Sequence, residues 1–170
     1  MNKPLNAPAQ VPVIARVIER FGDAVLAAHA DHGDQTVIVD PQRIVEIIGW
    51  LKSEPGLEFN VLMDLCGVDY LPRQPRFEVV YHLYSLRHNH RLRVKVQLDG
   101  KTPEVDSIAS LYLGANWCER EVWDMFGVRF VGHPDLRRIL MYDQFVGHPL
   151  RRDYPFDKRQ PIVEARTKHV

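Results

Sequence analysis

The chain has 170 residues, of which 45% are hydrophobic and 26% are charged, and its 22 basic and 22 acidic side chains cancel. This balance is typical of one globular domain and excludes a wholly disordered chain, collagen and a coiled coil. A neutral chain also lacks the positive balance that general nucleic-acid binding requires, so we expect no nucleic-acid partner.

The charge is unevenly spread along the sequence. Residues 1–70 carry a net charge of −5, and residues 71–101 carry a net charge of +5. Such a distribution suits a protein whose faces meet different neighbours. No charge-free stretch exceeds 12 residues. A membrane-spanning helix needs about 20 apolar residues, so the sequence predicts no such helix. Residues 1–8 lack the apolar core of a secretory signal.

Two segments in the first third of the chain have the apolar spacing of amphipathic helices. The first predicted helix covers residues 14–21, and Gly22 ends it. The second covers residues 44–51, with Asp40 as its N-cap and Pro41 as its first residue.

Five segments are predicted to be β-strands. They cover residues 25–30, 36–39, 57–65, 77–86 and 92–98. The third and the fifth alternate apolar with more polar positions, whereas the fourth is apolar on both faces, as in an interior strand. Turn-forming residues at 31–34 and 88–90 separate the first two and the last two strands, so each of these pairs is predicted to form a hairpin.

The remaining part of the chain completes the predicted fold. Residues 102–104 resemble a helix start and Gly114 resembles a helix end. The element order α-β-β-α-β-β-β-α predicts an α+β fold: a mixed β-sheet with helices packed on one face and an extended C-terminal arm. Periodicity fades after about residue 127, so we expect residues 1–130 to form the domain and residues 131–170 the arm.

Residues 116–127 are predicted to form a helix with one apolar and one charged side. Arg120, Glu121 and Asp124 share the charged side, where the first and the last of them have the i, i+4 spacing of an ion pair. Glu119 falls among the apolar positions, and we interpret it as a capping-box carboxylate that reaches back to the start of the helix.

Two tryptophans, Trp117 and Trp123, accompany these charges. A capped surface helix accounts for the carboxylate of Glu119 but less well for three consecutive charges beside two indole rings. Aromatic side chains next to charges are common where proteins meet. This segment is therefore a candidate interface.

The tail contains a short echo. A Gly-His-Pro turn occurs at residues 132–134 and again at residues 147–149, and arginine pairs follow at 137–138 and 151–152. Arginine makes forked bonds to carboxylates or phosphates. Apolar residues are interleaved throughout, which would be a liability in a free tail. We therefore expect the arm to pack on its own domain or on a partner.

The sequence contains few catalytic motifs. It has no glycine-rich nucleotide loop, no His-Glu-x-x-His and no Cys-x-x-Cys. His88 and His90 could bind zinc, but their predicted turn offers no further ligands. Cys66 and Cys118 are interpreted as small core residues in a reducing compartment, unable to hold an iron–sulfur cluster unaided. A stand-alone enzyme that uses Cys118 with His133 is the alternative from another class.

Residues 119–127 and 132–140 resemble the signature of the C-type subunit of the proton-pumping NADH–quinone oxidoreductase, respiratory complex I. Residues 147–155 resemble the C-terminal stretch of the same family, and residues 64–70 resemble its domain more loosely. Two departures are mild: residue 145 is Phe where many members have Trp, and residue 152 is Arg where Lys is frequent.

The resemblance implies a non-catalytic subunit of the peripheral arm that binds no cofactor and supports the D-type, quinone-site subunit. Cluster-carrying partners in the peripheral arm would hold the iron–sulfur clusters, and a flavin-binding partner would hold FMN. The complex would pass electrons from NADH to quinone while translocating protons. The chain would lie on the cytoplasmic side of the cell inner membrane, held there only through the complex. A counterpart in a membrane-bound hydrogenase or ferredoxin-dependent complex is the alternative within the same lineage.

The resemblance also implies a set of residues at the partner interface. They are Glu119, Arg120, Glu121, Asp124, Phe126, Gly132, His133, Pro134, Asp135, Arg137, Arg138, Gly147, His148, Pro149, Arg151, Arg152, Asp153 and Tyr154.

Overall fold

The computed structural model describes residues 13–162. The predicted absence of a secretory signal at residues 1–8 and the last part of the predicted arm, residues 163–170, lie outside these residues. The helices are α1 (Val13–Phe21), α2 (Ile44–Ser53) and α3 (Ala115–Phe126), with the short 3₁₀ turns η1 (Asp31–Gly33) and η2 (Pro41–Arg43). The strands are β1 (Val25–His29), β2 (Thr36–Val39), β3 (Val61–Asp69), β4 (Phe77–Ser85), β5 (His90–Leu98), β6 (Glu104–Asp106) and β7 (Arg129–Val131).

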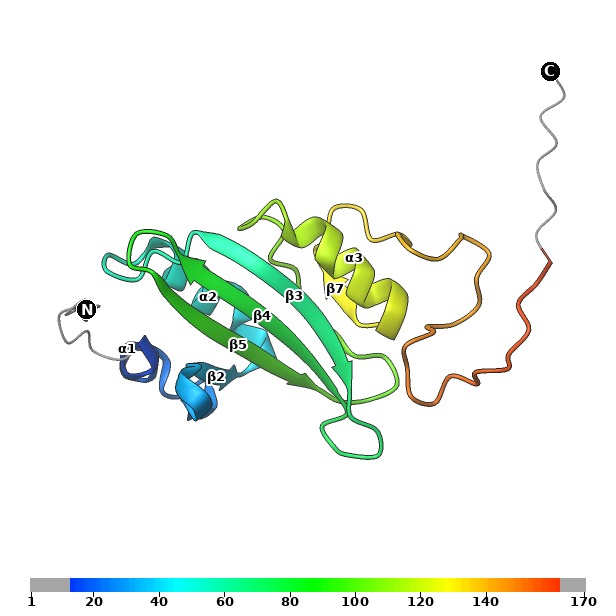
Figure 1. Ribbon diagram of the computed structural model, residues 1–170, viewed down its shortest axis with the longest axis horizontal. Coiled ribbons are helices and arrows are strands. Elements are labelled where there is room, and N and C mark those ends of the chain that lie inside the picture. The colour runs from blue at the N-terminus through cyan, green and yellow to red at the C-terminus, as the bar shows by residue number, and fades with distance from the viewer. Residues whose placement is uncertain (1–12, 163–170) are drawn as a thin grey trace, which may run out of the picture.

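Five of the strands form one mixed sheet in the order β1-β2-β5-β4-β3 (Figure 1). Strands β2 and β5 run parallel, and the other neighbouring pairs run antiparallel. The predicted mixed sheet and both predicted hairpins, β1–β2 and β4–β5, are therefore confirmed. Strands β6 and β7 pair separately as a parallel two-stranded sheet.

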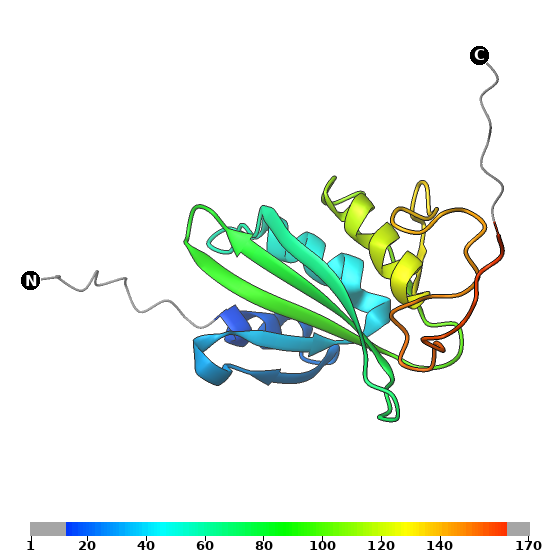
Figure 2. The ribbon, with the colours of Figure 1, turned by 45° about the vertical axis from the view of Figure 1, so that its right-hand side comes forward.

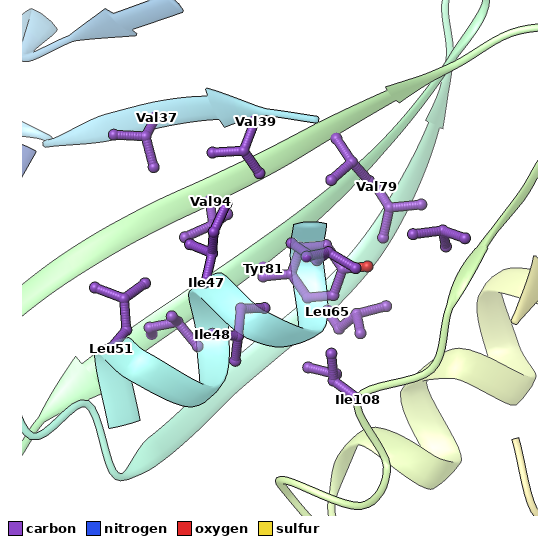
Figure 3. Close-up of a cluster of buried hydrophobic side chains, with 14 of the residues drawn as sticks. Val37, Val39, Ile47, Ile48, Leu51, Leu65, Val79, Tyr81, Val94 and Ile108 are labelled. Carbon is purple, nitrogen blue, oxygen red and sulfur yellow. The ribbon is translucent and has the colours of Figure 1, made fainter. Parts of the chain in front are cut away.

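The core lies between the sheet and α2. The strand register places Val37, Val94, Tyr81 and Leu65 side by side across four strands, so their side chains share one face. All four side chains are buried. Figure 3 shows Ile47, Ile48 and Leu51 of α2 packed over this face. In Figure 2, α2 lies behind the sheet, α3 lies beside β3, and no helix crosses the front face, so the helices pack on one face of the sheet, as predicted.

The start of α2 follows the predicted capping pattern. The Asp40 carboxylate accepts a hydrogen bond from the Gln42 amide at 2.9 Å, and Pro41 is the first residue of the turn that follows. This first turn is the 3₁₀ turn η2, so α2 itself begins at Ile44.

Two predictions between residues 57 and 114 are wrong. The helix expected from residue 102 to Gly114 is absent, and the segment instead contains β6 and turns. Strand β6 exists because it pairs with β7, whose residues come more than twenty positions later and leave no local signal. The strand expected from residue 57 begins only at Val61, since Glu58 has a positive φ of 44° that interrupts an extended backbone.

Helix α3 packs closely on β3 at Gly67. A Cβ atom added there would lie 2.8 Å from Cδ2 of Phe126 and 2.9 Å from Cγ1 of Val122. These two side chains project from successive turns of the same face of α3. The glycine therefore sets how closely the helix can approach the sheet, and with it the position of every α3 side chain.

We predict that Gly67→Val lowers the free energy of unfolding by about 1–3 kcal/mol, because the added carbons push α3 away from β3. Chemical denaturation of the isolated chain measures this change. Gly114→Ala is the matched control, since nothing lies within 4 Å of a Cβ there and its φ of −65° suits alanine. Equal stability of the Gly67→Val variant and the natural chain would contradict the close packing.

Candidate functional site

The C-terminal end of α3 is capped by the predicted arm. A helix leaves its last four carbonyl groups without partners inside the helix. The Gly127 amide, the His148 ring, the Leu150 amide and the Arg151 guanidinium donate, in turn, to the carbonyls of Trp123, Asp124, Met125 and Phe126. Three of the four donors belong to residues 148–151, so the arm completes a helix of the predicted domain. Figures 1 and 2 both show the arm beside this helix end.

The Asp124 carboxylate fixes the first part of the arm. It is fully buried, and Oδ2 accepts hydrogen bonds from three consecutive amides, those of Ile139 (3.1 Å), Leu140 (2.9 Å) and Met141 (2.9 Å). The Arg138 guanidinium donates to Oδ1. Burial acts to raise the pKa of this carboxyl, but the hydrogen bonds outweigh it and the pKa is lowered. Asp124 is therefore an ionised anchor.

Arg138, four residues after the first Gly-His-Pro turn, holds the segment that leads into the second. Its Nη2 donates to the carbonyls of Phe145 (2.8 Å) and Gly147 (3.0 Å). Its guanidinium lies 5.7 Å from the ring centre of Trp123 and 5.5 Å from that of Phe145. One arginine thus holds the arm to α3 and the arm to itself. Phe145, which stands where many members of the family have Trp, thus packs against the Arg138 guanidinium.

The predicted ion pair between Arg120 and Asp124 is wrong. Arg120 instead donates from Nε to the Arg137 carbonyl (3.1 Å) and from Nη2 to the Arg138 carbonyl (2.9 Å). The helical wheel correctly places both side chains away from β3, but the arm covers that side of the helix and takes both as partners. These contacts are intramolecular, and the partner-facing role expected of the two residues stays a prediction.

The predicted capping role of Glu119 is also wrong, since the residue before α3 is Gly114 and makes no side-chain cap. The Glu119 carboxylate is fully buried. Its Oε2 accepts a hydrogen bond from the Ser107 hydroxyl (2.5 Å), and its Oε1 accepts one from the Ile108 amide (2.7 Å). Burial raises the pKa of this carboxyl to about 7 in spite of both hydrogen bonds. Glu119 thus joins α3 to the segment after β6.

His133 lies at the other end of α3 from His148. Its Nε2 donates to the Asn116 carbonyl (3.0 Å) and lies 4.0 Å from Oε2 of Glu119, while its Nδ1 accepts from the Asp135 amide (3.0 Å). Both ring nitrogens are therefore engaged, so the Cys118–His133 nucleophile pair is not formed. Burial is the main cause of the raised pKa of the Cys118 thiol.

A second anchor holds the later part of the arm, and sequence reasoning missed it. Asp69, at the end of β3, accepts two hydrogen bonds from Arg76 (2.9 and 2.7 Å) and one from the Arg152 amide (2.9 Å). Arg76 also makes a two-pronged pair with Asp153 (2.9 and 2.7 Å). Burial acts to raise the pKa of Asp69, but these bonds lower it to about 2. The weak family likeness around residues 64–70 was the available signal.

The other predicted interface residues are spread around these anchors. Arg137 pairs with Asp135 at 2.8 Å, and both side chains are exposed, as is Glu121. The Tyr154 ring stacks on Phe145 at 6.0 Å. The remaining ones occupy turns or packing positions: Gly132 and Gly147 have positive φ, Pro134 and Pro149 follow them by two residues, and Phe126 packs at Gly67.

The described part of the chain offers two negative findings. Residues 13–162 contain no group of three His, Cys, Asp or Glu side chains placed to hold a metal ion. His88, one of the two candidate zinc ligands, instead contacts Oε2 of Glu58 through Nε2 at 2.6 Å. No helix within the same residues has the length and apolar character needed to cross a membrane.

Comparison with known proteins identifies close relatives. The family described as the 30 kDa subunit of the respiratory-chain NADH dehydrogenase matches residues 37–160. The second C-type subunit of the NADH-quinone oxidoreductase of Rhizobium etli (strain CIAT 652) is 50% identical over 152 residues, covering 87% of this chain and 81% of the relative. The C-type subunit of the same enzyme from Roseiflexus sp. (strain RS-1) is 50% identical over 143 residues, covering 84% and 82%.

Two solved structures share the fold. A trypsin-resistant fragment of Nqo5, residues 1–134, aligns with a TM-score of 0.63 at 35% identity and covers 72% of this chain and 98% of the fragment. A chain of an archaeal membrane-bound sulfane sulfur reductase complex aligns with a TM-score of 0.70, covering 93% and 97%, at 20% identity. At that identity the second likeness shows the fold alone.

We predict that Asp124→Asn loosens the arm and lowers the free energy of unfolding by about 3–5 kcal/mol. The substitution leaves the largely buried Arg138 guanidinium without its charge partner and disturbs three backbone hydrogen bonds. Denaturant titration measures the loss, and limited proteolysis should show faster cleavage between residues 138 and 147. Glu121→Gln is the control, because that carboxylate is exposed. Unchanged proteolysis of the Asp124→Asn variant would contradict the anchor.

The raised pKa of Glu119 predicts a pH dependence of stability. The folded state holds its proton up to about pH 7, whereas an unfolded glutamate releases it near pH 4.5. The stabilisation is therefore complete below about pH 4.5 and is lost as the pH rises through 7. Relative to Glu119→Gln, the natural chain should lose roughly 3 kcal/mol of unfolding free energy across this range. A constant difference between the two proteins would contradict the prediction.

Proposed function

The chain belongs to the family of the 30 kDa subunit of the respiratory-chain NADH dehydrogenase, and we propose that it is a structural subunit in the peripheral arm of NADH–quinone oxidoreductase. In this proposal partner subunits carry the FMN and the iron–sulfur clusters. The complex transfers electrons from NADH to quinone and translocates protons, and this chain contributes shape and binding surface.

One observation carries the structural role. The charged residues of the family-like signature hold the backbone of their own chain in place. Asp124 binds three amides of the arm, Arg120 binds two of its carbonyls, and Glu119 binds the turn after β6. Groups that are committed to backbone partners serve to build a surface, so the signature supports assembly and not proton transfer.

The arm supplies the surface that we propose for the quinone-site subunit. Several apolar side chains of the arm remain exposed although the arm is anchored: Leu140 (57%), Val146 (50%), Leu150 (55%) and Phe156 (100%). Exposed apolar residues gathered on one segment indicate contact with another protein. Residues 131–170 form the partner-binding arm in this proposal. The chain lies on the cytoplasmic side of the membrane and is held there only through the complex.

The proposal is tested by purifying the complex through an affinity tag on this chain. The tagged chain should co-elute with NADH:quinone oxidoreductase activity and with flavin and cluster absorbance. The chain produced alone should fold and show neither activity nor visible absorbance. Elution of the chain without the complex, or a chromophore bound to the isolated chain at near one per molecule, would overturn the proposal.

We predict that Arg120→Ala lowers the amount of assembled complex and leaves the turnover per complex unchanged. The variant loses two charge-assisted hydrogen bonds to the arm, each worth about 1.5–3 kcal/mol, whereas the Asp124 anchor remains. Native gels measure assembly, and NADH oxidation per flavin measures turnover. Arg129→Ala is the control, since its side chain is 69% exposed and its nearest carboxylate is 3.6 Å away. Normal assembly with slow turnover would instead indicate a catalytic role.

A further inference from the structure

Residues 13–162 leave part of one side of helix α3 open. Trp117 is 69% exposed, and Leu113, in the turn just before α3, is 92% exposed. Glu121, one turn after Trp117, is exposed too. Residues four positions apart lie next to each other along a helix, so Trp117 and Glu121 are neighbours. Leu113 precedes them in a turn, where its carbonyl accepts a hydrogen bond from the Asn116 amide at 3.3 Å. We call these three residues the α3 strip.

The rest of α3 is occupied. Val122 and Phe126 pack on β3 at Gly67, on the opposite side of the helix. Asp124 lies on the same side as Trp117, two helical turns further on, where it and Arg120 hold the arm. The arm therefore borders the C-terminal end of the strip, while the Trp117 side chain remains 69% exposed. A partner that reaches it would touch the domain and the arm together.

The composition of the α3 strip differs from that of ordinary exposed apolar residues. Single exposed leucines are normal on a protein surface, and Leu26 (62%) and Leu86 (64%) are examples in this chain. A neighbouring leucine and tryptophan expose a larger continuous apolar area. Tryptophan is also among the side chains that most often dominate binding energy when a partner desolvates them. The strip therefore has the chemistry of a binding anchor.

Two carboxylates border this anchor and define the partner's charge. Glu121 makes no ion pair with any residue in the range 13–162. Asp64, on β3, is exposed, and its Oδ1 accepts only the amide of its neighbour Leu65 at 2.8 Å. Asp64 belongs to the strand on which α3 packs, so the two carboxylates add negative charge on neighbouring elements. A complementary partner would present lysine or arginine there.

We propose that the α3 strip is a docking site, separate from the arm, for another protein of the assembly that offers an apolar pocket for the Trp117 ring rimmed by basic side chains. This inference rests on the proposed membership in NADH–quinone oxidoreductase. The arm and the strip would then contact partner subunits next to each other along one helix. Stable assembly would then require both contacts, because this chain leaves both surfaces exposed.

An incorporation competition tests the proposal in the intact complex. Natural and variant chains with different tags are expressed together, and their ratio is measured in the purified complex. Trp117→Ala should be incorporated about 30-fold less than the natural chain, the loss expected for a hot-spot tryptophan. Glu121→Lys should be incorporated about tenfold less. Leu26→Ala, on the edge strand β1, is the matched control and should equal the natural chain.

Site-specific photo-crosslinking identifies the partner. A benzoylphenylalanine at position 117 of the assembled complex should form a single adduct, mapped by mass spectrometry to an apolar site beside lysine or arginine. The same probe at position 26 should give no such adduct. Equal incorporation of Trp117→Ala, or an adduct only within this chain or with a second copy of it, would overturn the docking site. Failure of the natural tagged chain to enter the complex would instead overturn the proposed function.

Discussion

The position of the arm depends on the Asp124 carboxylate. This group takes a guanidinium and three consecutive amides as partners, and it is itself held by a helix whose distance from the sheet is set at Gly67. A buried ionised carboxylate is tolerated only when its oxygens are fully bonded. If the arm left α3, the Asp124 carboxylate would lose its hydrogen-bond donors. The fold of the domain is therefore coupled to the shape of its partner-binding segment.

Three buried carboxylates use the same principle at different points of the structure. Asp124 anchors the start of the arm, Asp69 anchors its later part, and Glu119 anchors the turn after β6. Their pKa values diverge because burial outweighs the two hydrogen bonds at Glu119, whereas several backbone and arginine hydrogen bonds outweigh burial at Asp124 and Asp69. Glu119, with neutral donors alone and a histidine at 4.0 Å, keeps its proton near neutral pH. The charged residues of the signature thus mainly bind groups of their own chain. The exposed side chains of the α3 strip lie beside them.

Local patterns were sufficient for much of the fold and for little of the site. Helix α2, its Asp40 cap and the two hairpins were predictable because their signals lie within a few residues of each other. Strand β6 was not, since only its pairing with the distant β7 makes it extended. The position of Glu119 among apolar residues was a correct sign of burial, which the capping interpretation missed. Nothing in a helical wheel shows that an arm will fold over Asp124.

The repeated Gly-His-Pro turn of the arm contacts both ends of α3. His133 donates to the Asn116 carbonyl in the first turn of the helix, and His148 donates to the Asp124 carbonyl in its last turn. These carbonyls are eight positions apart along the helix, a span of about 12 Å at 1.5 Å per residue. The 14 residues between the histidines, 134–147, cross that span as a loop tied by Arg138. The repeated turn therefore binds the two ends of one helix, and the side chains of Trp117 and Glu121 between them remain exposed.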